Sequence, residues 1–312
     1  ALAERVALLQ KLYEALMDNQ DSLAGLLTAE QGKPFAEAKG EIAIGAAYIR
    51  WFAEEVRRNK GEIIPSPVNG RRMLVSHHPV GVVGAITPWN FPSSMLARKL
   101  GPALAVGCTT VVKPASLTPY SALAWGKLAE EAGFPAGVIN IVTGSAREIG
   151  AAMMADPRIR KVTFTGSTEV GKTLIRRSAD TVKKLSMELG GNAPFIVFDD
   201  ADLDRAVEGA MIAKYRNSGQ TCVCANRIYV QSGIHDAFVS KLTAATEALK
   251  VGNGAKPGIE QGPLIDKGTY DKVSELVADA SSKGAEVVTG GGAHERGGTW
   301  FQPTVITGVN AE

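Results

Sequence analysis

The sequence predicts an α/β fold built on a parallel sheet, and two observations lead to this prediction. From Val82 onward, short apolar runs rich in Val, Ile and Thr alternate with longer segments of helical periodicity. Gly107 and Gly133 stand where the C-termini of two of these helices are expected. Repeated strand–helix units of this length give a parallel sheet with helices on both faces, and such a sheet binds ligands at the carboxyl ends of its strands.

Residues 1–57 are predicted to be helical. Asp21 is a plausible N-cap, and Gly32 and Pro34 are expected to end that segment. Pro34 then opens a longer helix, because its fixed backbone angle suits the first helical turn.

Residues 61–79 have a different pattern. Two apolar triplets, 62–64 and 73–75, flank a stretch that contains two prolines, an asparagine and a glycine. This pattern predicts a β-hairpin with a loose turn. The hairpin could be an arm for contact between subunits, and an ordinary surface hairpin is an equally good interpretation.

The rest of the chain consists of predicted strands and helices on either side of Gly190-Gly191, where we place a domain boundary. The strands before it are predicted at 82–86, 109–112, 138–142, 161–164 and 184–187. The helices before it are predicted at 93–106, 119–132, 146–155 and 168–179. The elements after it are predicted at 195–198, 202–215, 228–230, 234–249, 266–282, 286–288 and 304–306. The second domain, 191–312, has the appearance of an unfinished α/β unit.

Composition excludes several classes of function. The chain is 45% hydrophobic, as in globular proteins, and no apolar run approaches the roughly 20 residues that span a bilayer. Its net charge of +2 predicts no strong attraction to nucleic acid or to a membrane surface. Three cysteines are too few for a disulfide framework, which favours a cytoplasmic location. The four histidines lack the spacing of metal ligands, so no metal site is predicted.

Cys222 is the candidate nucleophile. It ends a small, polar, glycine-containing loop, 217–222, between a helical run and a strand-like run. A thiolate attacks carbonyl carbon well, and the polar residues before Cys222 favour this role over the buried structural role that we expect for Cys108. Cys224 could share a face with Cys222 and pair with it on oxidation, or it could fill space.

Two further stretches offer the other groups that acyl chemistry on sulfur requires. Glu188 follows a predicted strand, and its apolar neighbours predict a buried carboxylate suited to a general base; a capping or salt-bridged glutamate is the alternative. Asn90 lies in a loop fixed by prolines and anchored by aromatic residues, where its amide could donate to an oxyanion. A structural role is the more common one for an isolated asparagine in a turn.

Together these stretches closely resemble the aldehyde dehydrogenase superfamily, in the order of the family and over nearly all of the chain. The matching stretches are 87–92, 112–115, 164–168, 187–191 and 219–222. The chain looks most like the NADP-linked bacterial succinate-semialdehyde dehydrogenase subfamily, because of residues 194–202 and 216–224.

The resemblance implies a Rossmann-like, doubly wound dinucleotide-binding domain with N-terminal helices, 1–190, and a catalytic domain, 191–312, truncated at its C-terminus. It implies that the hairpin at 61–79 contacts another subunit and that the full-length protein is a homodimer or homotetramer. The part of the family that carries a Glu-x-Phe-Gly-Pro stretch and a C-terminal tail has no counterpart in this sequence.

The resemblance also implies roles for the site residues. Cys222 attacks the aldehyde, and the Asn90 amide and the Cys222 backbone N–H hold the oxyanion. Hydride transfer to the nicotinamide leaves a thioester, and Glu188 activates the water that hydrolyses it. The residues implied to bind the cofactor are Thr87, Pro88, Trp89, Lys113, Ser116, Gly166, Ser167 and Leu189.

Lys113 and Ser116 bear on the choice of cofactor. A carboxylate after the second strand of a dinucleotide fold takes the ribose hydroxyls and repels a 2′-phosphate. NAD-linked relatives commonly carry Glu at the position of Ser116, whereas this stretch has a cation, a hydroxyl and no acid. NADP is therefore favoured, and NAD stays possible if Lys113 is merely a solvated lysine at a strand end.

Arg98 and Arg216 match arginines that bind the substrate carboxylate in the resembled subfamily. A buried pair of arginines can hold a carboxylate by bidentate hydrogen bonds and discriminate against uncharged aldehydes. A surface salt bridge is the alternative for either. Succinate semialdehyde is the expected substrate, and glutarate semialdehyde, which adds one methylene, is the alternative.

A nucleoside triphosphatase is the remote alternative to a dehydrogenase. Residues 166–173 fit the phosphate-loop pattern of two glycines followed by Lys and Thr after a strand. This interpretation leaves Asn90, Glu188 and Cys222 unexplained, and it would place the carboxylate of Glu169 inside an anion-binding loop.

Overall fold

The computed structural model describes residues 1–310 and divides the chain into two compact units. The first unit contains Ala1–Leu27 and Lys39–Leu189. The second contains Thr28–Ala38 and the chain from Gly190 onward. Ala311 and Glu312, the last two residues of the predicted second domain, lie outside the described residues.

The first unit is built on a parallel sheet, as the sequence predicts. Within the described residues the sheet has five strands in the order β5-β4-β3-β6-β7. The strands are β3 (Val82–Ile86), β4 (Thr109–Lys113), β5 (Ile139–Ile141), β6 (Ile159–Thr165) and β7 (Lys184–Glu188). The sheet is central and doubly wound, with β3 paired to both β4 and β6. Each predicted strand is confirmed, with ends displaced by at most a few residues.

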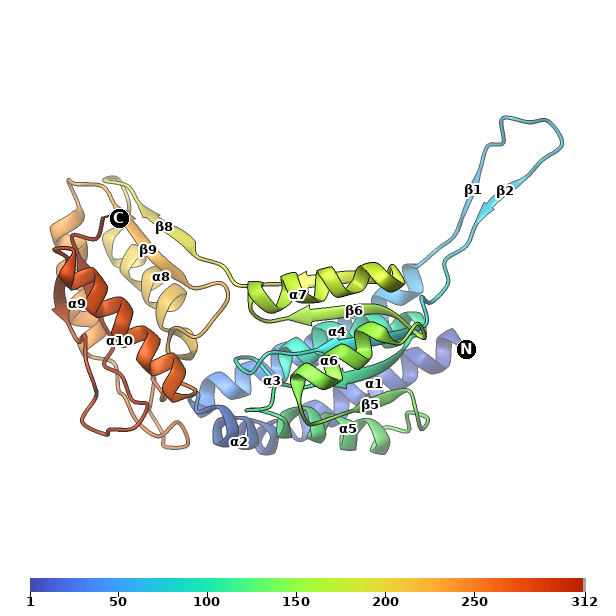
Figure 1. The fold of residues 1–312 in the computed structure, drawn as a ribbon, viewed down its shortest axis with the longest axis horizontal. Helices are drawn as coiled ribbons and strands as arrows, with labels where there is room; N and C mark the ends of the chain where they lie inside the picture. The colour runs from blue at the N-terminus through green and yellow to red at the C-terminus, as the bar shows by residue number, and fades with distance from the viewer. Residues whose placement is uncertain (311–312) are drawn as a thin grey trace. The chain divides into compact units, whose positions relative to one another are not determined.

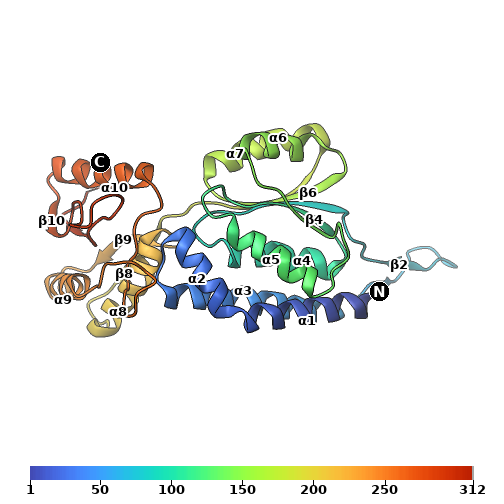
Figure 2. The ribbon, with the colours of Figure 1, turned by 90° about the horizontal axis from the view of Figure 1, so that it is seen from below.

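Helices cover both faces of this sheet (Figure 2). One face carries α4 (Ser94–Val106) and α5 (Tyr120–Glu131), and the other carries α6 (Ala146–Ala155) and α7 (Thr168–Ser178). The second face buries a cluster of apolar side chains from α6, β6 and α7: Met153, Met154, Ile159, Val162, Phe164 and Leu174. Burial of this apolar surface stabilises the layered arrangement.

The N-terminal helices α1 (Leu2–Asp18), α2 (Gln20–Gln31) and α3 (Phe35–Glu55) precede a short 3₁₀ turn, η1 (Val56–Arg58). Leu9, Leu12 and Leu16 are fully buried along one face of α1. The prediction of Asp21 as an N-cap is wrong, since α2 begins at Gln20. The Asp21 carboxylate lies in the first turn, where it suits the helix dipole, and it pairs with Lys39 at 2.6 Å.

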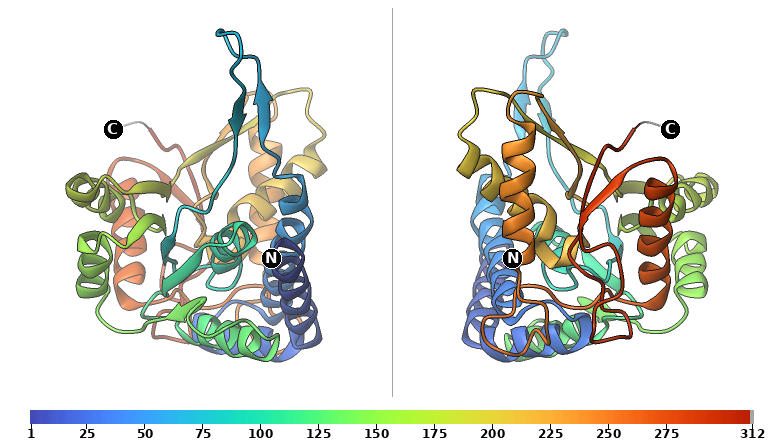
Figure 3. Two further views of the ribbon diagram at one scale, coloured as in Figure 1. Left: turned by 90° about the vertical axis from the view of Figure 1, so that its right-hand side faces the viewer. Right: turned by 90° about the vertical axis from the view of Figure 1, so that its left-hand side faces the viewer.

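The hairpin is formed by β1 (Glu62–Ile64) and β2 (Met73–Val75), which pair antiparallel. It extends away from the rest of the first unit (Figures 1 and 3). The side chains of Ile63 and Leu74 are 79% and 72% exposed. The predicted hairpin is therefore confirmed as an element.

The second unit has its own core. Its parallel strands β8 (Ala193–Val197) and β9 (Ala225–Val230) pack with α8 (Leu203–Tyr215) and α9 (His235–Glu247). It also holds α10 (Lys267–Ser282) and the antiparallel pair β10 (Glu286–Thr289) and β11 (Val305–Thr307). The buried side chains of this core come from β8, α8, α9 and β11: Val197, Val207, Ala210, Phe238, Leu242 and Val305.

The segment Thr28–Ala38 folds with the second unit, although the predicted boundary placed it in the first domain. The backbone leaves helical geometry between α2 and α3, where Gly32 has a φ of +96°. Its backbone groups are therefore available to the second unit, and the Phe35 N–H donates to the Gly254 carbonyl at 2.9 Å. The sequence indicates where the helix breaks, but it does not indicate that the Gly254 carbonyl accepts a hydrogen bond from this segment.

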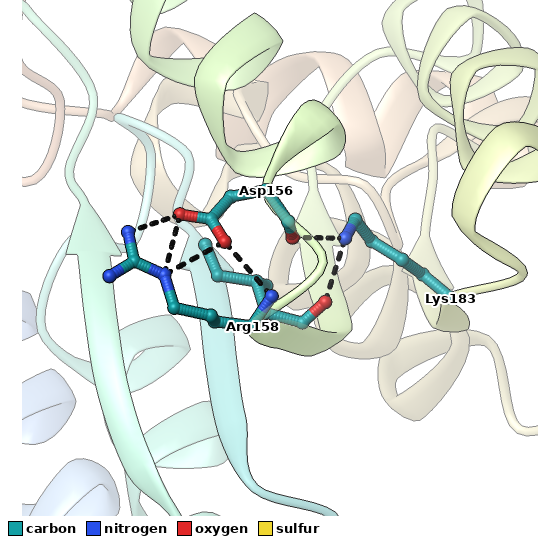
Figure 4. A network of polar contacts seen from close by, with 4 residues as sticks. Asp156, Arg158 and Lys183 are labelled. Carbon is teal, nitrogen blue, oxygen red and sulfur yellow. Dashed lines mark hydrogen bonds and ion pairs between the residues drawn. The ribbon is translucent and has the colours of Figure 1, made fainter.

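A polar network fixes the start of β6, at the amino end of the strand (Figure 4). Lys183 is buried, and its Nζ donates to the carbonyls of Asp156 and Ile159 at 2.6 and 2.7 Å. Hydrogen bonds from the Arg158 side chain hold the pKa of Asp156 down to about 2. The network lies at the end of the sheet opposite to the one where ligands are expected.

Candidate functional site

The loop after β3 lies at the carboxyl edge of the sheet, and residues at the end of β4 and in the loop after it hold it. The Thr87 N–H donates to the Lys113 carbonyl at 3.1 Å, and the Thr118 hydroxyl donates to the Trp89 carbonyl at 3.5 Å. Thr87 is buried, and its hydroxyl has no hydrogen-bond partner in the described part of the chain. Pro88 and Trp89 are half-buried beside it. The loop therefore has a fixed backbone and an available hydroxyl.

Asn90 is half-buried at the end of this loop, directly before the buried start of α4. The buried carboxylate of Glu41 accepts hydrogen bonds from the Ser93 and Ser94 N–H groups at 2.9 and 3.0 Å. Trp125 donates its indole N–H to the Ser93 hydroxyl at 2.9 Å. These bonds fix the backbone that follows Asn90. Sequence reasoning found Asn90 but missed Glu41.

Lys113 ends β4 and is not a solvated lysine. Its side chain is 2% exposed, and Nζ donates to the Pro114 carbonyl at 2.5 Å and lies 3.5 Å from the Ser116 hydroxyl oxygen. Burial lowers the pKa of Lys113. Ser116 itself is exposed. The structure therefore places a buried cation beside an accessible hydroxyl at the carboxyl end of β4.

Gly166 and Ser167 connect β6 to α7. The Gly166 N–H donates to the Glu188 carbonyl at 3.1 Å, and the Ser167 hydroxyl caps α7 by accepting from the Val170 N–H at 3.3 Å. A Cβ atom on Gly171 would lie 2.5 Å from Cδ2 of Leu189, so this glycine allows α7 to pack closely on the end of β7.

The phosphate-loop alternative is wrong. Such a loop must wrap its backbone N–H groups around phosphates before its helix begins. Here α7 already begins at Thr168, so Glu169 to Thr173 are helical. The Thr173 hydroxyl bonds to the Glu169 carbonyl within the helix, at 3.2 Å.

Glu188 is exposed, so the prediction of a buried carboxylate is wrong for this chain. Strand β7 is an edge strand of the sheet within the described residues, and an edge strand has no neighbour on one side. The apolar residues before Glu188 pack against α6 and α7 without enclosing its carboxylate. The residue pairs with Thr165 across β6 and β7.

Lys99 is a charged residue of the site that sequence reasoning missed. It is 5% exposed on α4, and its Nζ donates to the hydroxyls of Thr163 and Thr165 on β6 at 3.1 and 2.8 Å. Burial lowers the pKa of Lys99 to about 8, against the opposing attraction of Glu188. A signal was present: Lys99 falls on the apolar face of its helix, at helical spacing from Leu96 and Ala103.

Cys222 lies in the second unit, exposed in a turn between η3 (Arg216–Gly219) and β9. A Cβ atom on Gly191 would lie 2.8 Å from the Cys222 carbonyl oxygen, so the backbone of Gly191 runs close to this turn. Gln220 anchors the preceding loop by accepting from the Ile265 N–H at 2.9 Å. The nucleophile candidate is therefore accessible on a held backbone.

Cys222 and Cys224 are both free, and they occupy different surroundings. Cys224 is buried, and its thiol donates to the Lys214 carbonyl, 3.4 Å from Sγ, and accepts from the Thr221 hydroxyl at 2.8 Å. The intervening residues form a turn rather than the extended stretch that would place both cysteines on one face. Cys108 is buried, as expected.

Arg98 and Arg216 are both exposed, so the expected burial of this pair is wrong. The Arg98 guanidinium carbon lies 5.3 Å from the ring centroid of Tyr48. Arg216 follows the last residue of α8 with a ψ of 130°, which turns the chain out of the helix. A position on the solvent face of α4 and a position after a helix end both leave a long side chain in water.

The predicted residues thus fall into two groups. Carboxyl ends of the strands in the first unit carry Thr87, Pro88, Trp89, Asn90, Lys113, Ser116, Gly166, Ser167, Glu188 and Leu189, and α4 carries Arg98. The second unit carries Arg216 and Cys222. Over residues 1–310, no three His, Cys, Asp or Glu side chains gather as metal ligands would. None of the helices described is both long and apolar enough to cross a bilayer.

The first unit has a doubly wound sheet with helix-capping loops at its strand ends. The second α/β unit carries an exposed cysteine on an anchored loop. These features define an oxidoreductase-like architecture of two units. The model of the aldehyde dehydrogenase family matches residues 1–312. The chain belongs to the aldehyde dehydrogenase family.

Similar proteins refine this placement. The chain is 59% identical over 306 residues to a glutarate-semialdehyde dehydrogenase of Pseudomonas aeruginosa, covering 98% of this chain and 63% of that protein. It is 57% identical over 308 residues to the NADP-dependent succinate-semialdehyde dehydrogenase of Escherichia coli K12, covering 99% and 64%. A crystal structure of an E. coli NADP-dependent enzyme matches with a TM-score of 0.99 and 56% identity, covering 100% and 65%. The chain therefore spans less than two thirds of the length of these relatives.

Proposed function

We propose that the protein to which this chain belongs oxidises succinate semialdehyde to succinate with NADP. The observation that carries this proposal is the exposed thiol of Cys222 on an anchored loop, within a chain of the aldehyde dehydrogenase family. An accessible thiol on a rigid backbone is what attack on an aldehyde carbon requires.

In the proposed reaction, the Cys222 thiolate adds to the aldehyde carbon and forms a thiohemiacetal. The Asn90 amide and the Cys222 N–H donate to its oxyanion, which lowers the energy of the charged oxygen. Loss of hydride leaves a thioester on Cys222. Glu188 accepts a proton from water, and the hydroxide attacks the thioester and releases succinate and the thiol. Exposure of the Glu188 carboxylate is compatible with this role, because the base must reach water.

NADP would accept the hydride, and residues of the first unit fit such a cofactor. Thr87 offers a buried hydroxyl at the carboxyl edge of the sheet. Lys113 is a buried cation beside Ser116, and a 2′-phosphate there would favour the charged form of Lys113, which burial alone disfavours. The capped start of α7 suits a pyrophosphate. NAD would lack the phosphate that this cation attracts.

Glutarate semialdehyde is the second candidate substrate, and the 59% identity to a glutarate-semialdehyde dehydrogenase favours it. Both substrates end in a carboxylate, which Arg98 and Arg216 would bind by charge-assisted hydrogen bonds. One methylene discriminates by only about 1–3 kcal/mol, so activity on both acids is compatible with one site. We further propose that the β1–β2 hairpin contacts a second subunit of a homodimer or homotetramer.

The test is formation of reduced nicotinamide by the full-length protein, followed by its absorbance. Succinate semialdehyde, glutarate semialdehyde and butyraldehyde are compared, each with NADP and with NAD. We expect a strong preference for the acids and for NADP, and a loss of that acid preference in Arg216→Ala. We expect Cys222→Ala to abolish turnover while binding of the reduced cofactor, measured by its fluorescence, stays intact.

Each result has a distinct meaning. Normal turnover in Cys222→Ala would refute the mechanism. Equal rates with butyraldehyde and with the two acids would support aldehyde dehydrogenase activity but refute the assignment of a semialdehyde as the substrate. Equal efficiency with NAD would reject the proposed role of Lys113.

A further inference from the structure

The loop that leads to Cys222 contains three successive residues in the left-handed backbone region. Asn217, Ser218 and Gly219 have φ angles of 53°, 54° and 76°. Glycine adopts this region freely, whereas Asn and above all Ser adopt it at a conformational cost. Such strain persists only where surrounding contacts determine the backbone, and it is concentrated at functional sites.

Contacts within the second unit hold this left-handed turn. The Ser218 hydroxyl donates to the Gly262 carbonyl at 3.1 Å. The Asn217 side-chain amide donates to the Gln220 carbonyl at 3.2 Å, and the Gln220 side-chain amide donates back to the Asn217 carbonyl at the same distance. The turn ends three residues before Cys222, so its backbone sets the direction in which the cysteine is presented.

The first residue of the turn is held by Glu37. Arg216 turns the chain out of α8 with a ψ of 130°, so the next N–H loses the partner that a helix would supply. Asn217 is 1% exposed, and an unsatisfied N–H in this position would be costly. The Glu37 carboxylate accepts from this N–H at 2.8 Å, across 180 residues of sequence. A carboxylate makes this a charge-assisted hydrogen bond.

We propose that Glu37 is a positioning residue for Cys222: it holds the left-handed turn of residues 217–219 in the geometry that presents the thiol to the aldehyde. Glu37 does not touch the reacting atoms and acts through the backbone of Asn217. The proposal rests on the proposed function only in taking Cys222 as the nucleophile. The alternative interpretation is that Glu37, in the first turn of α3, only stabilises that helix through the helix dipole.

The two interpretations predict different results for two variants of the full-length protein. Glu37→Ala removes the acceptor, whereas Glu37→Gln keeps an acceptor oxygen and loses the charge. Glu148→Ala is the matched control, because Glu148 is also a first-turn acid, on α6, and is exposed. Deuterium exchange of peptides that cover residues 217–222, kcat for aldehyde oxidation, and the urea midpoint are measured for each.

We expect Glu37→Ala to lose protection at residues 217–222 and to lower kcat about 10- to 100-fold, the effect of a misplaced reacting group, with the KM for the cofactor unchanged. Glu37→Gln should retain most of the protection at residues 217–222 and most of kcat. Glu148→Ala should match the unmodified protein. If Glu37→Ala fails to fold, Glu37→Gln still tests the proposal, because it must retain protection of this segment.

Two results would overturn the proposal. One is unchanged protection and kcat in Glu37→Ala. The other is a fall in the urea midpoint with faster exchange throughout α3 and no selective change at residues 217–222. Absence of aldehyde oxidation in the unmodified protein would refute the proposed function instead, and the exchange measurement would still decide whether Glu37 holds the turn.

Discussion

At the scale of single residues, Lys99 carries the strongest electrostatic perturbation that the structure adds to the sequence. Its ammonium is buried on α4 and is satisfied by two threonine hydroxyls rather than by a carboxylate. Neutral hydroxyls leave the burial of the charge only partly offset, which is why the pKa falls to about 8. The attraction of the Glu188 carboxylate opposes this fall in the pKa of Lys99.

This shift predicts a dependence of stability on pH. The pKa of Lys99 is about 8 in the folded protein and 10.5 as the ordinary value, so the unfolded chain binds more protons between these limits. The free energy of unfolding should therefore rise as pH increases from 8 to 10.5, by about 3 kcal/mol from this one residue. Lys99→Met should lack this gain, as urea unfolding at several pH values would reveal. The exposed Lys127, changed to Met, is the control and should keep it; equal pH slopes for the unmodified protein and Lys99→Met would contradict the assignment.

Residue identity could be predicted at this scale better than residue environment. Cys222 and Asn90 were found because local neighbours (small polar residues, prolines and aromatics) mark their loops. Burial of Glu188, Arg98 and Arg216 was mispredicted because it depends on which elements pack nearby. An apolar neighbour in sequence can point to the opposite face of a strand, as happens on β7, and leave the polar side chain in water.

At the scale of elements, the start of α4 shows how a neighbouring helix can position a loop. Glu41 on α3 reaches the two N–H groups at the start of α4 and is itself 1% exposed. These N–H groups have no partner within their own helix, so a buried acceptor from elsewhere is required. The backbone directly after Asn90 is thereby fixed without any capping side chain in α4 itself.

Removal of this acceptor should be expensive. Glu41→Ala leaves two buried N–H groups without a partner, each worth about 1–3 kcal/mol, so we expect a loss of about 2–4 kcal/mol in the free energy of unfolding. Urea denaturation followed by tryptophan fluorescence would measure it. Glu54→Ala removes a surface pair with Arg50 from the same helix and should leave the free energy of unfolding nearly unchanged. Similar losses in both variants would show that Glu41 is not a special acceptor.

Element types and most boundaries follow from the sequence because strands and helices here have clean periodicity and glycine ends. The left-handed Gly107 after α4 is an example of a boundary that one residue type determines. The exception at Asp21 is instructive. A single residue, Asn19, separates α1 from α2, so no extended N-cap position was available to Asp21.

At the scale of the whole molecule, the chain does not divide at a single point. The segment Thr28–Ala38 belongs to the second unit although the chain on either side of it belongs to the first. Sequence reasoning placed one boundary, near Gly190, because composition and pattern change there. It had no means to detect the other, since contacts between residues far apart in the sequence leave no mark on local periodicity.

The backbone of Gly262 lies close to that of the segment Thr28–Ala38. The packing of this segment in the second unit should therefore be sensitive to a single added methyl group. A Cβ atom there would lie 2.1 Å from the Gly32 carbonyl oxygen, so Gly262→Ala must displace backbone and should destabilise by about 1–3 kcal/mol. Gly268→Ala is the control: its Cβ meets nothing closer than 3.6 Å, and alanine suits the first turn of α10. The urea midpoint should fall for the first variant and stay or rise for the second. Equal midpoints would show that the segment accommodates the methyl group.

The membership of Thr28–Ala38 in the second unit has a consequence for the order in which the protein is made. Glu37 leaves the ribosome 180 residues before Asn217, its hydrogen-bond partner. At synthesis rates of roughly 5–20 residues per second, the carboxylate waits about 10–40 s for that partner. During that interval residues 28–38 are nascent chain without their native surroundings, exposed to chaperones and proteases. The cysteine-bearing loop therefore cannot be completed until 180 residues after its N-terminal support has been synthesised.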